Sequence, residues 1–255
     1  MIRWWLNPDD RNTPVGESFA SLDAVFALEG EAVAWAPLST VTRVSVGDTR
    51  FYVKRYAGNG KNLSRSWFGL RGLIGPQRVN KEWQNLRRFA AWGIPTARLV
   101  AFGLERRFAY FLRGTLITEE LRGTTDLARM AREADPRLQN RTWVASVARQ
   151  IAVATRRMHA EGFVHNDLKW RNLLVDNAAS PTVYFIDCPA GSHWWGVFLR
   201  YRIIKDLACL DKLGQYHLTR SQRLRFYLDY TGHAKLTPAD KARIRKVVAF
   251  FRGRE

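Results

Sequence analysis

The sequence lacks several features that would assign the chain to a familiar class at once. No apolar run approaches the roughly 18 residues that a membrane-spanning helix needs. Two cysteines, Cys188 and Cys209, are too few for a disulfide scaffold, and no Cys/His spacing typical of a zinc site occurs. The N-terminal residues contain no apolar stretch of the length that a signal peptide requires. These absences favour a soluble, cytoplasmic protein.

Acidic residues are also scarce. The chain has 41 Lys and Arg against 23 Asp and Glu, which gives a formal net charge of +18. Such a charge attracts nucleic acid, anionic lipid or phosphorylated glycans, but it does not choose among them, and it is also compatible with a role in solubility alone. With 255 residues, 46% of them hydrophobic, the chain is long enough for one bilobal enzyme or two small domains.

Hydrophobic patterning predicts a β-rich first part at residues 1–121, although residues 1–30 have no clear pattern. Alternation of apolar and polar residues with a period of two indicates a strand, and apolar residues that recur with a period near 3.6 indicate a helix. The predicted elements are strands at 40–46, 50–56, 108–112 and 116–120, the last two on either side of Arg-Gly-Thr at 113–115, and one main helix from residue 76 to just before Gly93. Residues 57–76 form a basic insert that contains glycine.

The second part, residues 122–255, is predicted to be mostly helical. Apolar residues from Val144 to Met158 recur at helical spacing, and Gly162 ends this helix. A strand pair follows at 173–176 and 182–187, and helix resumes near Tyr201. We therefore expect an α+β, bilobal fold with a β-rich N-lobe, a shortened helical C-lobe and a cleft between them.

The strongest chemical signal is the loop His-Asn-Asp-Leu-Lys-Trp-Arg-Asn at 165–172, followed by Asp187 at the end of an apolar run. Phosphoryl transfer needs an aspartate that accepts the proton of the attacking hydroxyl or orients it, a role that suits Asp167. Asn172 and Asp187 offer the hard oxygen ligands that Mg²⁺ prefers. Lys169 can neutralise charge on the transferring phosphoryl group. The pattern predicts a kinase-type site.

This loop resembles the catalytic loop of the protein-kinase-like superfamily, with Asn166 in place of the usual arginine. The resemblance implies that Asp167 is the catalytic base and Lys169 a phosphate contact. It also implies that Asn172 and Asp187 bind Mg²⁺. These roles presuppose the bilobal fold of the superfamily.

Other positions near the loop either follow this superfamily or depart from it. The usual Asp-Phe-Gly reads Asp-Cys-Pro at 187–189, so we expect no activation-loop switching. Asp206 resembles the buried helix aspartate that braces the catalytic loop, although an ordinary acid on a helix surface fits the sequence nearly as well. We expect His165 to hold the loop by packing and hydrogen bonding rather than to act as an acid or base.

The resemblance also assigns nucleotide-binding roles in the first part. Lys54 looks like the strand lysine of the superfamily, and Glu82, on the apolar side of the predicted helix, looks like its glutamate partner. A solvated strand charge and a surface acid are the alternatives. Residues 116–121 look like the hinge that holds adenine through the backbone, which makes Glu119 and Leu121 the expected contacts.

A glycine-rich phosphate loop is missing before Lys54. The segment that precedes the lysine strand reads Ala-Pro-Leu-Ser-Thr-Val-Thr at 36–42. Backbone amides or hydroxyls of Ser39 and Thr40 are the candidates to cover the phosphates of ATP, because successive N–H groups can form an anion-binding concavity.

Within the superfamily, the sequence is most similar to bacterial lipopolysaccharide-core kinases, which phosphorylate heptose or Kdo sugars. The shared features are Lys54, Lys81-Glu82-Trp83, Gly93-Ile94-Pro95, Thr118-Glu119-Glu120-Leu121, His165-x-Asp167 and Lys205-Asp206-Leu207-Ala208. This resemblance implies ATP and Mg²⁺ as cofactors, a glycolipid acceptor in the lipopolysaccharide core, and no specific nucleic acid partner. It also implies a peripheral position on the inner face of the bacterial inner membrane. No Ala-Pro-Glu follows Asp187, so the platform that docks a peptide substrate is expected to be absent.

Two basic, aromatic stretches, 61–74 and 193–202, suit an anionic membrane, unless their tryptophans belong to the core.

One alternative function is an aminoglycoside- or choline-type phosphotransferase, but the cationic substrates of such enzymes suit a charge of +18 poorly. Another is a non-catalytic kinase-like binding protein. The chain keeps all four polar groups that a kinase needs, Lys54, Asp167, Asn172 and Asp187, which argues against this second alternative. The sequence predicts neither the sugar hydroxyl nor the oligomeric state.

Overall fold

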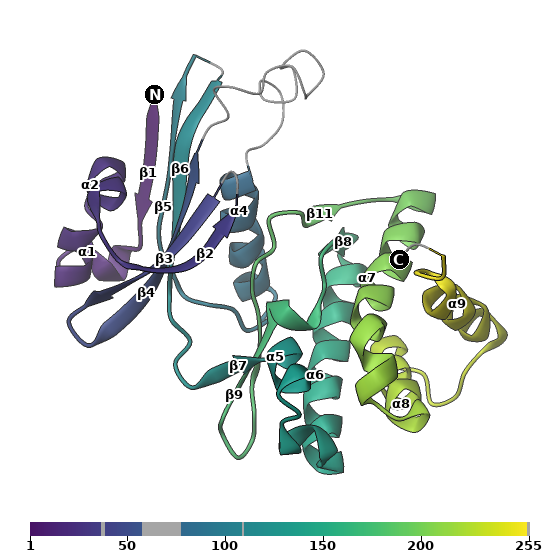
Figure 1. Ribbon diagram of the computed structural model, residues 1–255. Helices are drawn as coiled ribbons and strands as arrows, with labels where there is room; N and C mark the ends of the chain where they lie inside the picture. The colour runs from purple at the N-terminus through teal and green to yellow at the C-terminus, as the bar shows by residue number, and fades with distance from the viewer. Residues whose placement is uncertain (37–38, 58–77, 109, 254–255) are drawn as a thin grey trace. The chain divides into compact units, whose positions relative to one another are not determined.

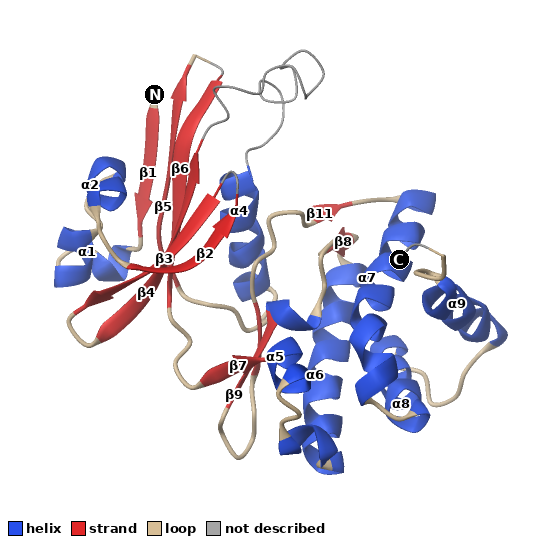
Figure 2. Cartoon of the chain, viewed as in Figure 1, coloured by secondary structure: helices blue, strands red, loops and turns tan. Residues whose placement is uncertain are grey.

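The computed structural model of the chain describes residues 1–36, 39–57, 78–108 and 110–253 (Figure 1). The described chain mixes helices with antiparallel sheet, which confirms the α+β class (Figure 2). It divides into two compact units. Unit 1 contains Met1–Arg87 and Ala97–Leu121, and unit 2 contains Arg88–Thr96 and Arg122–Glu255.

A six-stranded antiparallel sheet, in the order β1-β5-β6-β4-β3-β2, forms the body of unit 1. Its strands are β1 (Ile2–Leu6), β2 (Glu31–Ala36), β3 (Ser39–Val46), β4 (Thr49–Ala57), β5 (Leu99–Arg107) and β6 (Tyr110–Glu119). The interior strand β4 places Lys54 opposite Val41 on β3 and Leu116 on β6. Phe51 and Val53 lie at alternate positions of β4 and are buried in the core.

The predicted strands β3 and β4 are confirmed and pair with each other. The division into two strands on either side of 113–115 is wrong. Strand β6 runs through these residues and pairs with β5, which the sequence did not predict. A side chain at Gly114 would place its Cβ 2.9 Å from the backbone oxygen of Gly103. Gly114 therefore permits close packing inside the sheet rather than a turn. The connection between the strands includes Phe108, whose φ is 53°.

The N-terminal residues, which show no clear sequence pattern, add β1 and β2 to the sheet edges and form three short helices. These are η1 (Pro8–Asp10), α1 (Pro14–Ser18) and α2 (Leu22–Ala27). Thr13 and Ser21 begin α1 and α2, because their side chains accept hydrogen bonds from backbone N–H groups of the first turn. Phe19 and Val25 pack in the core of the sheet.

The main helix of the first part, α4 (Arg78–Ala91), is confirmed from the point where the described residues resume. It buries Glu82 and Trp83, and Trp83 stacks on Phe102 of β5 with ring centroids 4.6 Å apart. The end of the helix belongs to unit 2, where the ring of Phe89 contacts that of Phe163. The basic insert and the expected membrane stretch at 61–74 lie outside the described residues.

Unit 2 is mostly helical, as predicted. Its elements are β7 (Thr124–Asp126), α5 (Leu127–Arg132), η4 (Pro136–Gln139), α6 (Arg141–Ala160), β8 (Phe163–Val164), η5 (Trp170–Asn172), β9 (Leu173–Asp176), β10 (Val183–Phe185), β11 (Ser192–His193), α7 (Gly196–His217), α8 (Arg220–Thr231) and α9 (Pro238–Ala249). Helix α6 ends before Gly162, whose φ is 69°. The pairing of β9 with β10 is confirmed. Helix α7 begins at Gly196, a few residues earlier than predicted.

Helices α5 to α9 of unit 2 surround an apolar cavity of about 490 Å³. Its lining includes Trp143, Val147, Leu210, Leu224 and Val248. Within the described residues, we find no helix with the length and apolar character needed to cross a bilayer.

Candidate active site

The loop at 165–172 connects β8 to β9, and neighbouring elements fix its backbone. Asp206, in the middle of α7 and fully buried, accepts hydrogen bonds from the backbone N–H groups of His165 (2.7 Å) and Asn166 (2.9 Å). At the other end, the Nδ2 group of Asn172 donates to the backbone oxygen of Asp167 at 2.8 Å. Asp206 therefore braces the loop, as the resemblance implied, and is not a surface acid.

The side chain of His165 supports the loop by packing. Its ring is fully buried and stacks on Phe89 with centroids 6.0 Å apart. Neither ring nitrogen has a hydrogen-bond partner among the described residues, so the expected hydrogen bonding comes from the backbone N–H of His165 and not from its ring. Burial lowers the pKa of His165, which keeps the imidazole neutral and unsuited to act as an acid at neutral pH.

Two basic side chains of the same loop surround the carboxylate of Asp167. The Nζ atom of Lys169 lies 2.6 Å from one carboxylate oxygen, and Nη2 of Arg171 lies 3.2 Å from the other. Partial burial raises the pKa of Asp167, but the hydrogen bonds and charges of these two residues outweigh it and leave the pKa below 3.8. Asp167 is therefore ionised at neutral pH.

Asn172 connects Asp167 to the segment that carries Asp187. Because the Nδ2 group of Asn172 donates to Asp167, only the Oδ1 atom of the Asn172 side chain can bind a cation. The backbone oxygen of Asn172 accepts a hydrogen bond from Ile186 at 3.0 Å, so the residue before Asp187 lies against Asn172. An amide oxygen and a carboxylate suit Mg²⁺. The described residues contain no group of three or more His, Cys, Asp or Glu that could hold a metal on its own.

Asn166 makes contacts that the sequence analysis did not foresee. Its φ of 65° is left-handed, a conformation that asparagine tolerates better than most residues. Its Nδ2 group donates to the backbone oxygen of Ala190 at 2.8 Å, and its Oδ1 atom accepts from Arg202 of α7 at 3.2 Å. The residue that replaces the usual arginine thus joins the loop to both the 190–192 segment and α7.

In unit 1, the structure brings the predicted lysine and glutamate together. The Nζ atom of Lys54 lies 3.0 Å from both carboxylate oxygens of Glu82. The hydroxyl group of Tyr56, two residues further along β4, donates a hydrogen bond to the same carboxylate. Glu82 is buried and the side chain of Lys54 is largely buried, so the pair is neither a solvated strand charge nor a surface acid.

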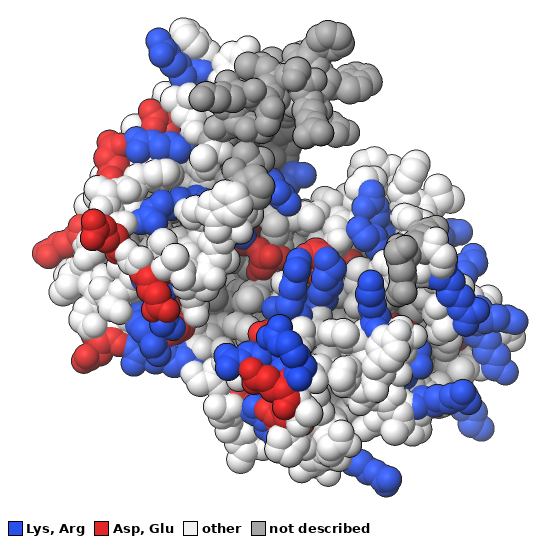
Figure 3. Space-filling view, viewed as in Figure 1, with Lys and Arg blue, Asp and Glu red and all other residues white. Residues whose placement is uncertain are grey.

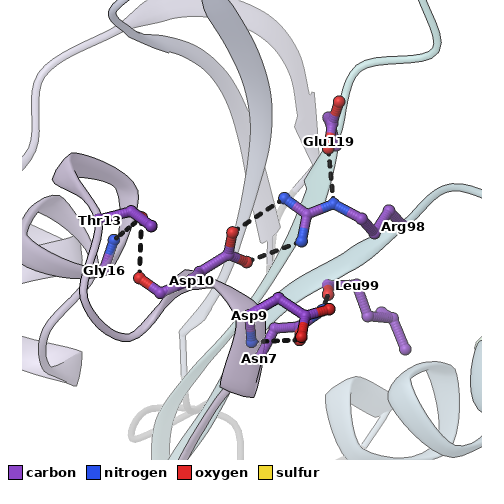
Figure 4. A network of polar contacts seen from close by, with 8 residues as sticks. All are labelled: Asn7, Asp9, Asp10, Thr13, Gly16, Arg98, Leu99 and Glu119. Carbon is purple, nitrogen blue, oxygen red and sulfur yellow. Dashed lines mark hydrogen bonds and ion pairs between the residues drawn. The ribbon is translucent and has the colours of Figure 1, made fainter.

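A network of charged side chains holds the expected hinge (Figure 4). Arg98 donates to both carboxylate oxygens of Asp10, at 2.8 and 3.1 Å, and its Nε group donates to Glu119 at 2.6 Å. The backbone N–H of Glu119 donates to the backbone oxygen of Arg98. Glu119 could therefore contact adenine only through its carbonyl oxygen. Asp10 lies in the N-terminal region, residues 1–30, in which no clear sequence pattern was found.

The remaining residues predicted to contact the nucleotide lie at the start of β3 and at the C-terminal end of unit 1. Ser39 and Thr40 begin β3, opposite Tyr56 and Arg55 of β4, and both are half-buried. Residues 37–38, in the segment expected to cover the phosphates, lie outside the described residues. Leu121 is the last residue of unit 1. The roles of Ser39, Thr40 and Leu121 stay predictions.

Comparisons with known proteins agree with this chemistry. The sequence model of the Lipopolysaccharide kinase (Kdo/WaaP) family matches residues 21–244. The lipopolysaccharide core heptose(I) kinase WaaP of Pseudomonas aeruginosa is 30% identical over 155 residues, which are 57% of this chain and 54% of that protein. The chain thus matches about half the length of this curated relative.

Among solved structures, WaaP in complex with acyl carrier protein is similar to the whole chain. The TM-score is 0.69 at 23% identity, and the match covers 99% of this chain and 97% of that one. This likeness confirms the kinase-like fold that the sequence predicted.

Proposed function

The chain belongs to the Lipopolysaccharide kinase (Kdo/WaaP) family, and from this membership we propose that it transfers the γ-phosphoryl group of ATP to a sugar hydroxyl of the lipopolysaccharide inner core. The acceptor sugar would be heptose or Kdo. The observation that carries the proposal is the loop around Asp167, in which Lys169 and the buried Asn172 each lie within hydrogen-bond distance of an ionised carboxylate.

In this proposal Asp167 accepts the proton of the attacking hydroxyl. The acceptor oxygen forms a bond to the γ-phosphorus while the bond from that phosphorus to the β–γ bridging oxygen breaks, and ADP leaves. Lys169, which contacts Asp167 at 2.6 Å, would stabilise negative charge on the transferring group. The proton moves to the carboxylate as the new bond forms, so Asp167 must be ionised before the reaction.

Magnesium would be held by Oδ1 of Asn172 and the carboxylate of Asp187. The hydrogen bond from the backbone N–H of Ile186 to the backbone oxygen of Asn172 brings the segments that carry these two residues together. When bound, Mg²⁺ supplies positive charge that offsets the charge of the phosphates. The hydrogen bond from Nδ2 of Asn172 to the backbone oxygen of Asp167 keeps these two residues in a fixed relation, and Asp206 braces the start of the same loop.

Unit 1 would supply the contacts to the rest of the nucleotide. Lys54, oriented by Glu82, would bind the α- and β-phosphates. The carbonyl oxygen of Glu119 and the backbone of Leu121 would contact adenine, and Ser39 and Thr40 would cover the phosphates. The ion pair supports this role because a buried carboxylate fixes the ammonium group before ATP arrives.

The acceptor proposed here is a lipid-linked glycan, so the protein would act as a peripheral protein at the cytoplasmic face of the inner membrane.

A second partner is suggested by the structural neighbour, which is a complex with acyl carrier protein. The apolar cavity of unit 2, at about 490 Å³, is large enough to receive part of an acyl chain. A carrier protein with an acyl chain should then raise the melting temperature of this protein more than the same carrier without one.

Mass spectrometry of lipopolysaccharide core tests the function in cells. Core from cells that lack the protein should be missing one phosphate, and expression of the wild-type chain should restore it. Asp167→Asn should not restore it. Asp229→Asn is the matched control, because Asp229 also pairs with an arginine four residues away but lies on α8. An unchanged core in cells without the protein would contradict the proposal.

A further inference from the structure

The first two turns of α7 expose large apolar side chains to solvent. Trp195 is 78% exposed, Phe198 is 63% exposed and Tyr201 is 49% exposed, and Val197 is exposed as well. A folded domain normally turns such side chains inward, so a contiguous exposed group of them indicates an interaction surface. The sequence left open whether the tryptophans of 193–202 belong to the core, and Trp195 does not.

Two of these side chains, Phe198 and Tyr201, make ring contacts with further aromatic residues. Trp194 lies 6.2 Å from Phe198, and Tyr201 lies 5.7 Å from Phe250, which follows α9. We refer to Trp194, Trp195, Val197, Phe198, Tyr201 and Phe250 as the aromatic patch. The patch is built by two segments far apart in the sequence, 194–201 and 250.

The two segments that build the aromatic patch carry charged residues of one sign. Residues 188–205 and 241–253 contain no Asp or Glu. They carry eight basic residues: Arg200, Arg202, Lys205, Lys241, Arg243, Arg245, Lys246 and Arg252. Lys and Arg side chains gather over α9 and beside α7 in Figure 3. Exposed aromatic side chains flanked by basic ones are the combination that suits the boundary between lipid headgroups and acyl chains.

We propose that the aromatic patch docks on the surface of a bilayer that contains anionic phospholipid. The proposal deepens the proposed function, on which it rests, because it names the surface by which the enzyme reaches a lipid-linked acceptor. Trp195 and Phe198 enter the interface, and the basic residues contact headgroup phosphates. Charge complementarity selects this partner. A second copy of the chain would bring basic residues against basic residues, which opposes association.

The same helix connects the aromatic patch to the loop of Asp167. Arg202 packs over the ring of Trp194 at 4.6 Å and donates to Oδ1 of Asn166, the residue next to Asp167. One turn further along α7, Asp206 holds the backbone of the loop. Docking through the first turns of α7 therefore keeps the loop of Asp167 near the bilayer surface, where a glycolipid presents its sugars.

Vesicle co-sedimentation of the full chain, without nucleotide or acceptor, tests the proposal. The wild-type chain should pellet with vesicles of phosphatidylglycerol and phosphatidylcholine, and less with phosphatidylcholine alone or at raised salt. The double variant Trp195→Ser/Phe198→Ser should bind the anionic vesicles at least about tenfold more weakly. Tyr216→Ser is the control, because Tyr216 is 74% exposed near the other end of α7. Circular dichroism should show equal melting temperatures for all variants.

Several outcomes would overturn the proposal. These are equal pelleting with neutral and anionic vesicles, or an equal loss of binding in the control and the double variant. A dimer that only the double variant disrupts, with no vesicle binding by the wild type, would assign the patch to self-association instead. Turnover of ATP with deacylated core oligosaccharide is measured separately. The double variant should retain it, so loss of kinase activity and loss of membrane binding are told apart.

Discussion

The guanidinium group of Arg202 in α7 donates a hydrogen bond to Oδ1 of Asn166, which directly precedes Asp167. The Nδ2 group of the same asparagine donates to the backbone oxygen of Ala190. One side chain thus ties the loop of Asp167 to two other segments of unit 2. We assign Asn166 and Arg202 as positioning residues, which act on the reaction through the placement of Asp167.

Asn166→Gly removes these side-chain bonds and still permits the left-handed φ of 65°. Loss of two hydrogen bonds at about 1 kcal/mol each predicts a fall in kcat of about tenfold or somewhat more, with an unchanged KM for ATP. Steady-state kinetics measures both constants. Asn177→Gly is the control, because Asn177 also accepts from an arginine, Arg137 at 2.7 Å, but lies in a surface turn. A kcat that does not differ between the two variants would remove the positioning role.

The pKa of Asp167 predicts how activity responds to acid. A carboxylate that acts as a base must be ionised, and the basic neighbours of Asp167 keep its pKa below 3.8. Arg171→Gln removes one of these charges while burial still raises the pKa, so the acid limb of the profile of kcat/KM should move to higher pH. Arg157→Gln removes an equal charge from an exposed pair on α6 and should leave the limb in place. A shift to lower pH in Arg171→Gln would contradict the assignment.

The ion pair of Lys54 and Glu82 predicts nucleotide affinity. Lys54→Met should weaken ATP binding by about tenfold or more, because a charge-assisted contact to phosphate contributes about 1.5–3 kcal/mol. Glu82→Gln should weaken it less, since the lysine keeps its charge but loses its anchor. Isothermal titration calorimetry measures both. Lys81→Met, one residue before Glu82 on α4, should bind ATP normally. Equal affinities for Lys54→Met and Lys81→Met would sink the assignment.

Close packing at Gly114 predicts a stability effect in unit 1. In Gly114→Ala the new Cβ would lie 2.9 Å from the backbone oxygen of Gly103, so the free energy of unfolding should fall by about 1–3 kcal/mol. At Gly214 in α7 the nearest atoms lie 3.8 Å from the added Cβ. Gly214→Ala should therefore be neutral or stabilising by up to about 1 kcal/mol. Urea denaturation of both variants checks the difference.

Local hydrophobic periodicity in the sequence predicted several of the strands and helices. Alternation at 40–46 and 50–56 predicted β3 and β4, and helical spacing predicted α4 and α6. Strand β1 could not be predicted because it is stabilised by pairing with β5, about a hundred residues away. The predicted division of β6 into two strands around Gly114 was wrong, because the pattern cannot distinguish a glycine that interrupts a strand from one that makes room for a neighbouring strand.

In the candidate site, too, the residues of one local pattern could be predicted, and contacts between distant residues could not. Spacing within 165–172 predicted which residues share the loop, and the inward position of Glu82 predicted that it needs a cationic partner. The contacts of Asn166 could not be predicted, because they depend on Arg202 and on a left-handed backbone conformation. Asp10 was missed because its partner, Arg98, belongs to a distant strand connection and neither residue stands in a recognisable pattern.

Transfer of radiolabelled phosphate from γ-labelled ATP to deacylated inner-core oligosaccharide tests the central claim most directly. Wild-type protein should label the oligosaccharide, with a single phosphate on one sugar. Asp167→Ala should lower turnover by about two to four orders of magnitude, the usual contribution of a positioned base, and should still bind ATP. Near-normal labelling by Asp167→Ala, or no labelling by the wild type, would contradict the account.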